Sequence, residues 1–486
     1  MHPNQEWARG EPLPYVKRRR HTGVVRIAIL GGGPAGYEAA LVAVELGAQV
    51  TLVERDGIGG ACVLTDCVPS KALISTAEVR TSVAGAAALG LSCSQTPVDA
   101  RQINSRILSL AAAQSADIRA RLLREGVEVI AGRGRLLGPG HFCVQREGSA
   151  EEEQRFSDIV LLAFGATPRV IPGSEPDGER ILDWRQLYAL TAMPEHLIVV
   201  GSGVTGAEFA SAYQALGSQV TLVSSRDRVL PGEDADAATV LEDVFRRRGI
   251  EVLNRSRAAS IHRHGDEVVV KLTDGRSVSG SHALIAVGSV PDTAGLGLED
   301  AGVKLRVSGH IEVDKVSRTA LPGVYAAGDC TGVLPLASVA AMQGRIAMWH
   351  ALGEAVAPLR LMTVAANVFT DPEIATVGVS QQQVEAGRVI ADVVKLDLAT
   401  NARAKMSGLE DGFVKLFCRR GSGAVLGGVV VAPRASELIL PVSMAVQHSL
   451  SVDQMAHTFS VYPSLSGSLT EAARQLMSKE AVSVEP

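Results

Sequence analysis

Two cysteines, Cys62 and Cys67, lie five positions apart in the segment GGACVLTDCVPSK. Thiol pairs can carry electrons by cycling between a dithiol and a disulfide. On a regular helix, residues five apart have Cα atoms roughly 8–9 Å apart, whereas a disulfide requires about 4.4–6.8 Å. A bridge therefore needs a bent backbone, to which Gly59, Gly60 and Pro69 are suited. The spacing leaves two interpretations open: a redox pair, or two reduced thiols that only pack against their neighbours.

The composition excludes several classes of protein. The chain has 486 residues and a net charge of −5, so it is long enough for several domains and has no general basic surface for nucleic acid. Six cysteines in this length do not form a secreted disulfide scaffold, and we expect a cytoplasmic protein. No apolar run approaches the ~20 residues of a membrane helix. We predict no integral membrane segment and no bound metal.

A strand, a glycine-rich turn and a helix follow one another near the start of the chain. The buried-strand run VVRIAIL (24–30) precedes GGGPAG (31–36), and a second strand ends at Glu54. Glycines at this spacing let a pyrophosphate approach a helix N-terminus. An acid about 20 residues downstream can bind a ribose. The sequence therefore predicts a dinucleotide site, with the contacts Gly31, Gly33, Pro34, Ala35, Gly36 and Glu54.

The same pattern recurs in the middle of the chain. The strand HLIVV (196–200) precedes GSGVTG (201–206), but the next strand ends in SSRDR (224–228) and not in an acid. Without the carboxylate, nearby arginines can hold a 2′-phosphate, which favours NADPH and leaves NADH open. The predicted contacts here are Gly201, Gly203, Gly206, Ser224 and Arg226.

A third segment, TALPGVYAAGDC (319–330), ends a predicted strand in Gly328-Asp329. An acid in this place can bind the sugar-alcohol chain of a flavin nucleotide, although Gly-Asp alone is usually a turn. Two dinucleotide sites with a thiol pair beside the first indicate FAD and NAD(P)H as the two cofactors.

Taken in order, these segments resemble the flavoprotein disulfide reductases, the family of dihydrolipoyl dehydrogenase and glutathione reductase. The resemblance covers about residues 24–478. It implies an α/β fold with two Rossmann-like dinucleotide-binding domains plus a C-terminal α+β dimerisation domain. The implied divisions are a flexible tail (1–23), the first part of the FAD-binding domain (24–170), the NAD(P)H-binding domain (171–290), the second part of the FAD-binding domain (291–358) and the dimerisation domain (359–486).

The resemblance also assigns roles to individual residues. Cys67 would lie against the flavin, and Cys62 would be the outer, exchanging sulfur. Lys71 and Glu208 match the family's ion pair beside the hydride-accepting flavin nitrogen. Asp329 would bind the flavin ribitol. The further cofactor contacts that follow are Gly60, Lys71, Gly165, Gly288 and Gly328.

The chain departs from the family near its C-terminus. Members that reduce disulfides carry His-x-His-Pro-Thr-x-x-Glu there, and the second His and the Glu serve the active site of the opposite subunit. This chain reads SVYPSLSGS (460–468), which places Tyr462 at the His position and Gly467 at the Glu position. A tyrosine pKa near 10 makes a poor thiol base, but the hydroxyl can donate a hydrogen bond.

The sequence is most similar to the NAD(P)H-quinone dehydrogenase branch of this family, whose members lack the usual His and Glu. We therefore expect a homodimeric NAD(P)H:quinone oxidoreductase with Cys62, Cys67, Lys71, Glu208 and Tyr462 as its catalytic groups. In that branch the redox disulfide is often incomplete, so the cycling of the two cysteines stays open. The alternatives are a dihydrolipoyl dehydrogenase-like enzyme and a flavin-binding redox sensor with little turnover.

Overall fold

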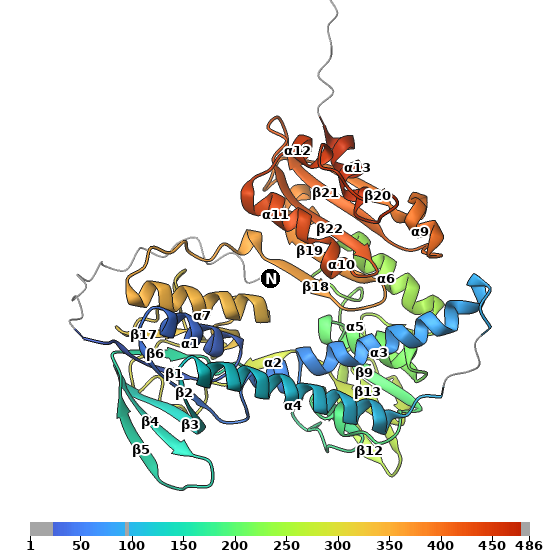
Figure 1. Cartoon of the computed structure of the whole chain (residues 1–486). Coiled ribbons are helices and arrows are strands. Elements are labelled where there is room, and N and C mark those ends of the chain that lie inside the picture. Colours follow the sequence, from blue (N-terminus) through green and yellow to red (C-terminus); the bar gives the residue numbers. More distant parts are fainter. Residues whose placement is uncertain (1–22, 93–96, 478–486) are drawn as a thin grey trace, which may run out of the picture.

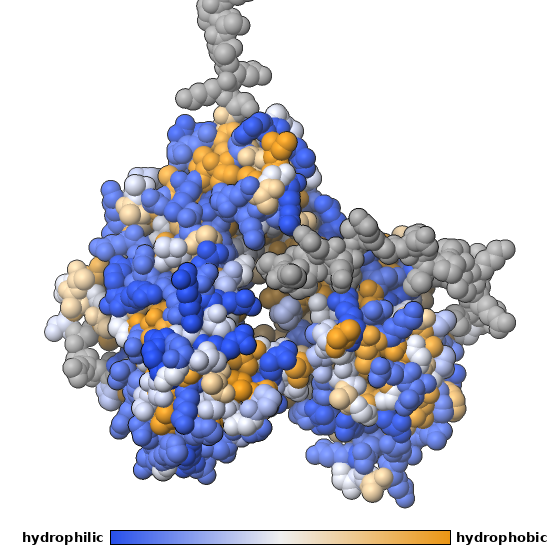
Figure 2. Space-filling model, turned by 180° about the vertical axis from the view of Figure 1, so that it is seen from behind, coloured by the Kyte–Doolittle hydropathy of each residue, from blue (hydrophilic) through white to orange (hydrophobic). Residues whose placement is uncertain are grey.

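The computed structural model describes residues 23–92 and 97–477 of the chain. Almost all of the predicted tail (1–23) lies outside the described residues. Figure 1 shows three units: a first nucleotide-binding unit in blue and teal, a second one mainly in green, and a C-terminal unit in red above both. Seen from behind, the two nucleotide-binding units are separated by a cleft below the C-terminal unit (Figure 2).

The first unit is built on a seven-stranded sheet in the order β17-β6-β1-β2-β3-β4-β5. The strands from β17 to β3 are parallel, whereas β3, β4 and β5 form an antiparallel extension. Parallel strands are buried on both faces, and β6 reads IVLL without a polar residue. The bounds are β1 (Arg26–Leu30), β2 (Gln49–Glu54), β3 (Glu128–Gly138), β4 (His141–Arg146), β5 (Glu152–Phe156), β6 (Ile159–Leu162) and β17 (Val324–Ala326).

Long helices cover this sheet and lead away from it. Helices α1 and α7 pack closely, because a Cβ at Gly344 would lie 2.1 Å from the Ala35 carbonyl oxygen. Helix α3 extends from the first unit to the second, where it packs against α5 (Figure 1). The bounds are α1 (Pro34–Glu45), α2 (Gly60–Leu64), α3 (Cys67–Gly85), α4 (Ala100–Arg124) and α7 (Ala337–Leu352), with 3₁₀ turns at Ala86–Leu89 and Asp329–Thr331.

The second unit repeats the βαβ arrangement on a five-stranded parallel sheet in the order β11-β10-β9-β15-β8. A three-stranded antiparallel sheet, β12-β13-β14, packs on it, and a two-stranded sheet of β7 and β16 joins it to the first unit. The bounds are β7 (Ala166–Pro168), β8 (Ile181–Asp183), β9 (His196–Val200), α5 (Val204–Ala215), β10 (Gln219–Val223), α6 (Ala235–Arg247), β11 (Glu251–Leu253), β12 (Ala258–His264), β13 (Glu267–Leu272), β14 (Ser277–Gly280), β15 (His282–Ile285) and β16 (Ser289–Pro291), with a 3₁₀ turn at Leu187–Ala189.

The C-terminal unit is an antiparallel sheet in the order β18-β19-β22-β21-β20, with helices packed on it. The bounds are β18 (Ala365–Val368), β19 (Glu373–Gly378), α8 (Gln381–Glu385), β20 (Ala391–Asp397), α9 (Ala402–Met406), β21 (Phe413–Arg419), β22 (Val425–Ala432), α10 (Ala435–Leu438), α11 (Leu440–His448), α12 (Val452–Ala456) and α13 (Gly467–Leu476), with 3₁₀ turns at Leu361–Thr363 and Leu398–Thr400. The predicted fold class, two Rossmann-like units plus a C-terminal α+β unit, is confirmed. In the described part of the chain, no helix combines the length and the apolar content that a membrane crossing requires.

Candidate active site

The first glycine-rich turn joins β1 to α1, and two of its positions admit only glycine. Gly31 has a φ of +110°, and a Cβ there would lie 2.1 Å from the Ala163 carbonyl oxygen. A Cβ at Gly36 would lie 1.9 Å from the Gly31 carbonyl oxygen. At Gly33, by contrast, a Cβ would meet no atom within 4 Å. The turn is therefore closed toward the protein and open on the side from which a pyrophosphate would approach.

Helix α1 begins at this turn, and its first N–H groups have no partner among the residues that the structure describes. Gly33 is the N-cap residue and supplies no side-chain cap, and Pro34 occupies the first helical position. The first backbone bond of the helix runs from the Tyr37 N–H to the Gly33 carbonyl oxygen at 3.0 Å. Unpaired N–H groups at a helix start bind phosphate well, so the residues present suit the pyrophosphate of FAD.

Glu54 lies at the end of β2 with its carboxylate turned toward the glycine turn. It accepts hydrogen bonds from the Gly32 N–H at 2.5 Å and from the Asp56 N–H at 2.7 Å. A carboxylate has about four acceptor positions, so this one is held in place and can still accept hydrogen bonds from a ribose.

Asp329 follows β17, at the point predicted for the flavin ribitol. Gly328 has a φ of +84°, and its N–H donates to Gln343 Oε1 at 3.0 Å. The Asp329 carboxylate accepts no hydrogen bond from the described residues. Burial, together with the smaller effect of the nearby Asp66, raises its pKa to about 6. A buried acid that has no hydrogen-bond donor in the described part of the chain is suited to the hydroxyl groups of a ligand. Gly165, at the end of the adjacent β6, has a φ of +72° and open space beside it.

The second glycine turn, between β9 and α5, repeats the first one position by position. A Cβ at Gly201 would lie 2.2 Å from the Ala286 carbonyl oxygen, and one at Gly206 would lie 1.8 Å from the Gly201 carbonyl oxygen. Gly203 and Gly288 again face open space. The two turns thus offer the same kind of opening to two separate dinucleotides.

The two residues predicted for nucleotide selectivity follow β10, and they differ in exposure. Ser224 is fully buried, lies 2.6 Å from Ser202 Oγ and accepts a hydrogen bond from the Arg226 N–H at 3.2 Å. Its hydroxyl therefore organises the loop, and a nucleotide would have to compete for it. The Arg226 side chain is exposed, and its guanidinium has no partner among the described residues. Arg226 is thus the better placed of the two for a 2′-phosphate.

The cysteine pair lies next to the first glycine turn, because a Cβ at Gly60 would come within 2.9 Å of Gly33 Cα. Cys62 belongs to α2, and Cys67 is the first residue of α3. The required bend is at Thr65 and Asp66, whose N–H groups both donate to the Ala61 carbonyl oxygen. The sequence had suggested Gly59, Gly60 and Pro69 for this bend; instead, Gly59 and Gly60 start α2 and Pro69 lies in the first turn of α3.

Both thiols are free and half-buried. A hydrogen bond between the two sulfurs raises the pKa of Cys67 well above its usual range, and burial adds to the effect. The same bond lowers the pKa of Cys62. Of the two thiols, Cys62 is therefore the one that ionises first.

Lys71 and Glu208 form an ion pair between α3 and α5, with 2.8 Å between Lys71 Nζ and Glu208 Oε2. Lys71 lies four residues after Cys67, hence on the same face of α3. Burial acts to lower the pKa of Lys71, but the charge and the hydrogen bond of Glu208 outweigh it and the pKa is raised. A permanent positive charge thus stands beside the cysteine pair.

Tyr462 lies in the loop between α12 and α13, far along the chain from these groups. Its side chain is 86% exposed and makes no hydrogen bond or ring contact with the described residues. Gly467 is the first residue of α13, and His457 is exposed at the end of α12. The described chain does not bring Tyr462 to its own cysteines.

Three residues beside this site carried no signal in the sequence. Phe369 contacts both Lys71 and Glu208. Burial raises the pKa of Asp66 and, to a larger extent, that of Tyr188. The Tyr188 hydroxyl is buried and has no hydrogen-bond partner in the part of the chain that the structure describes. Phe369 and Tyr188 are distant in sequence from the motifs, and Asp66 stands between the two cysteines at a position that matches no motif residue. Only the structure therefore identifies them.

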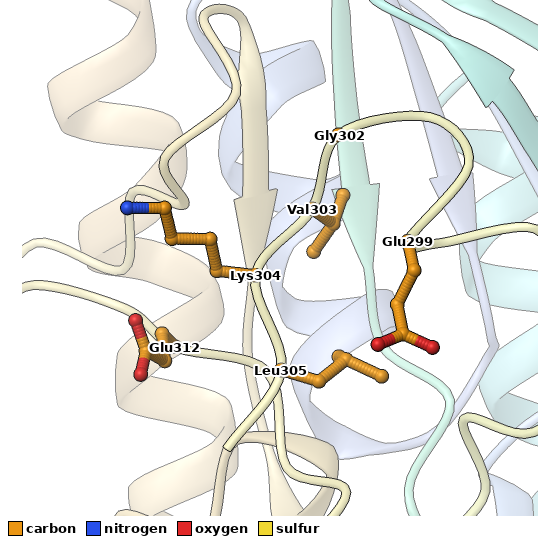
Figure 3. A pocket seen from close by; sticks show the side chains of 6 residues that line it. All are labelled: Glu299, Gly302, Val303, Lys304, Leu305 and Glu312. Atoms are coloured by element: carbon orange, nitrogen blue, oxygen red, sulfur yellow. The ribbon is translucent and has the colours of Figure 1, made fainter.

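A surface pocket of about 410 Å³ lies apart from the site, in the segment before β17 (Figure 3). It is lined by Glu299, Gly302, Val303, Lys304, Leu305 and Glu312. None of these residues is a predicted site residue. Across residues 23–92 and 97–477, no cluster of three or more His, Cys, Asp or Glu side chains could hold a metal ion.

Comparison with known proteins identifies the two halves of this arrangement. Residues 25–344 match the family described as "Pyridine nucleotide-disulphide oxidoreductase", and residues 364–473 match its dimerisation domain. The chain is 59% identical over 469 residues to "NAD(P)H dehydrogenase (quinone)" of Mycobacterium tuberculosis, covering 94% of this chain and 95% of the relative. It is 34% identical to a dihydrolipoyl dehydrogenase of Chlorobaculum tepidum, covering 92% and 96%.

Solved structures agree with these relatives. The crystal structure of LpdA from Mycobacterium tuberculosis matches with a TM-score of 0.90 at 59% identity, over 94% of this chain and 100% of that one. The HOCl-induced flavoprotein disulfide reductase RclA from Escherichia coli matches with a TM-score of 0.82 at 25% identity, over 93% and 99%. The fold is therefore shared along nearly the whole chain.

Proposed function

The chain belongs to the pyridine nucleotide-disulphide oxidoreductase family, and from this premise we propose that it is a homodimeric NAD(P)H:quinone oxidoreductase. It is a flavoprotein oxidoreductase whose family uses FAD and NAD(P)H. One observation carries the choice of acceptor. Both nucleotide turns and the Lys71–Glu208 pair are in place, whereas the C-terminal acid–base residues of disulfide exchange are replaced by Tyr462 and Gly467.

The residues of the chain divide the work of binding and orientation. FAD, when bound, supplies the redox chemistry by accepting a hydride from NAD(P)H and delivering two electrons onward. The turn 31–36 and Glu54 bind its pyrophosphate and adenosine ribose, and Asp329 binds its ribitol. Lys71 provides a fixed positive charge beside the isoalloxazine, which favours the reduced form electrostatically. Glu208 holds that charge in one orientation.

Disulfide exchange needs a base that takes and returns a proton near neutral pH. A tyrosine is not an acid–base group for the neutral pH range and a glycine has no side chain, so Tyr462 and Gly467 do not replace a His–Glu pair. A quinone makes a smaller demand: its oxygens need a hydrogen-bond or proton donor, and the exposed Tyr462 hydroxyl can serve as one. The cysteine pair is then not required for turnover.

The C-terminal unit would join two copies of the chain. Figure 2 shows an orange area on the surface of this unit, and several large apolar side chains of the unit are exposed. Such a patch is typical of an interface. Between the start of α11 and the start of α13, the exposed large apolar side chains are Leu440, Met444, Phe459, Val461 and Tyr462. In a homodimer, Tyr462 of one subunit would reach the site of the other. We place this homodimer in the cytoplasm. We favour NADPH over NADH because the exposed Arg226 guanidinium has no partner within residues 23–92 and 97–477.

Steady-state assays with NADPH or NADH test the proposal. We expect turnover of a small naphthoquinone to exceed that of glutathione disulfide and of dihydrolipoamide assayed with NAD⁺. We also expect the Cys67→Ser variant to keep quinone turnover within about threefold of wild type. Faster turnover of dihydrolipoamide would favour the alternative, dihydrolipoyl dehydrogenase chemistry, to which the 34% identical relatives point. Loss of quinone turnover in Cys67→Ser would show that electrons pass through sulfur.

A further inference from the structure

Phe369 connects the C-terminal unit to the charged pair of the proposed flavin site. It follows β18 directly, in the turn that leads to β19. Its neighbours in space belong to α3 and α5, which carry the Lys71–Glu208 pair. The sequence separation is large, 161 residues between Phe369 and Glu208. One residue of the third unit thus touches elements of the other two.

Phe369 contacts both partners of the ion pair, in two different ways. Its backbone N–H donates to Glu208 Oε1 at 2.9 Å, while Glu208 Oε2 is 2.8 Å from Lys71 Nζ. Its ring lies below the Lys71 ammonium, with 5.0 Å from Nζ to the ring centroid. Each Glu208 oxygen therefore has its own partner, and the ammonium is held between a carboxylate and an aromatic face.

A second contact anchors the turn that carries Phe369. The Asp371 N–H donates to Ser211 Oγ at 3.3 Å, on the same helix as Glu208. Arg248 also forms a salt bridge with Asp371, with 2.9 Å between the charged groups. The position of the Phe369 ring is therefore set by a turn bound to the second unit at several points, and not by the ring alone.

The side chains of Glu208 and Lys71 both need a further contact to stay in place. The Glu208 side chain is 4% exposed, and a buried carboxylate is costly unless both oxygens are paired. Lysine carries its charge on a flexible four-carbon chain, so one carboxylate oxygen does not define where the ammonium lies. An aromatic face attracts the cation and removes part of that freedom.

We propose that Phe369 is a positioning residue that fixes the Lys71 ammonium beside the flavin through its ring and fixes Glu208 through its backbone. This inference deepens the proposed function, since it depends on the assigned place of Lys71 next to FAD. The β18–β19 turn of the C-terminal unit would then help to set the reduction potential of bound FAD.

The test is the reduction potential of bound FAD, measured by anaerobic titration without any quinone. Phe369→Leu keeps an apolar side chain and removes the aromatic face. We expect the equilibrium constant for FAD reduction to fall by about three- to tenfold, which corresponds to a potential more negative by about 15–30 mV for a two-electron couple. Phe369→Tyr keeps the face and should keep the potential.

Two controls separate positioning from a general effect on packing. Phe413→Leu removes a comparable ring contact, 4.6 Å from Lys395 Nζ to the centroid, in the same C-terminal sheet, and should leave the potential unchanged. The double variant Phe369→Leu with Lys71→Met should have the same potential as Lys71→Met alone. If Phe369→Leu does not retain FAD, Phe369→Met takes its place.

Three results would overturn the inference. An unchanged potential in Phe369→Leu would show that the ring does not act on the cofactor. If Phe369→Leu shifted the reduction potential equally in the presence and in the absence of Lys71, the ring would act on the flavin without Lys71. An unchanged potential in Lys71→Met would remove the premise about Lys71 itself. Since no quinone is present, none of these outcomes depends on whether the acceptor has been identified correctly.

Discussion

Lys415 forms a buried ion pair whose removal gives a sharp prediction. It stands in β21, and its Nζ lies 2.9 and 2.8 Å from the two carboxylate oxygens of Asp234 and 2.8 Å from Asp236 Oδ2. The side chains of Lys415 and Asp234 are each 3% exposed. Asp234 is also the N-cap of α6. The pair therefore joins the C-terminal sheet to the second nucleotide-binding unit.

Lys415→Met leaves the Asp234 carboxylate buried without its cation. Breaking a buried pair in this way costs about 3–5 kcal/mol of unfolding free energy. The matched control is Lys395→Met, because Lys395 is 3.7 Å from Asp236 and both side chains are well exposed. An exposed pair of this kind contributes about 0–1 kcal/mol. Both lysines pair with Asp236, so the difference between the two losses of unfolding free energy reports the effect of burial.

A double variant tests the reason for the loss. Asp234→Asn removes the buried charge and keeps an oxygen that can cap α6. Lys415→Met with Asp234→Asn should therefore recover to within about 2 kcal/mol of wild type. The assay is equilibrium unfolding in urea at fixed protein and FAD concentration, with the slope m compared between variants. A loss in Lys415→Met no larger than in Lys395→Met, or a double variant less stable than the single one, would refute the reasoning.

Three further predictions concern the cofactors. Gly33→Ala should fold but lose most of its FAD, because the new Cβ fills only the open side of the turn. Gly36→Ala should instead lower the thermal midpoint of unfolding, because its Cβ meets the Gly31 carbonyl oxygen. If both variants changed FAD content and thermal midpoint equally, the assigned geometry would be contradicted. Arg226→Ala should lower kcat/KM for NADPH by about tenfold with NADH unaffected, and a parallel loss for both nucleotides would remove Arg226 from selectivity. Asp329 has a pKa of about 6 and binds hydroxyl groups best when charged, so the FAD affinity of the wild type should fall as the pH drops through 6. The affinity of Asp329→Asn should not change over this range. Flavin fluorescence at pH 5 and 7 measures both affinities, and identical pH profiles would argue against the contact.

The two βαβ units could be predicted from the sequence because their signals are local. At Gly31 and Gly201 the backbone has a positive φ, and at Gly36 and Gly206 a Cβ would strike the carbonyl oxygen five residues earlier. Such constraints depend on a few neighbouring residues, so motif spacing is enough to reveal them. The bend between Cys62 and Cys67 was expected for the same reason, but its position at Thr65 and Asp66 was not.

The identity of the reactive side chains was likewise a property of the sequence. Cys62, Cys67, Lys71 and the loss of the C-terminal His–Glu pair are all readable from the chain, and together they defined a flavoprotein oxidoreductase with a weakened case for disulfide exchange. What these residues touch was not readable. Ser224 is predicted to contact a nucleotide, yet its hydroxyl is engaged by Ser202 and by the backbone N–H of Arg226.

Contacts between distant segments were decided by the tertiary structure alone. Phe369 reaches Glu208 across 161 residues, and Lys415 reaches Asp234 across 181. Neither contact has a local signal, because each depends on how the C-terminal unit packs against the other two units. Local sterics determine a turn wherever its residues occur, whereas burial and pairing of a charge depend on every element around it. The sequence therefore determined which chemistry the protein carries, and the packing of its three units decided which residues hold that chemistry in place.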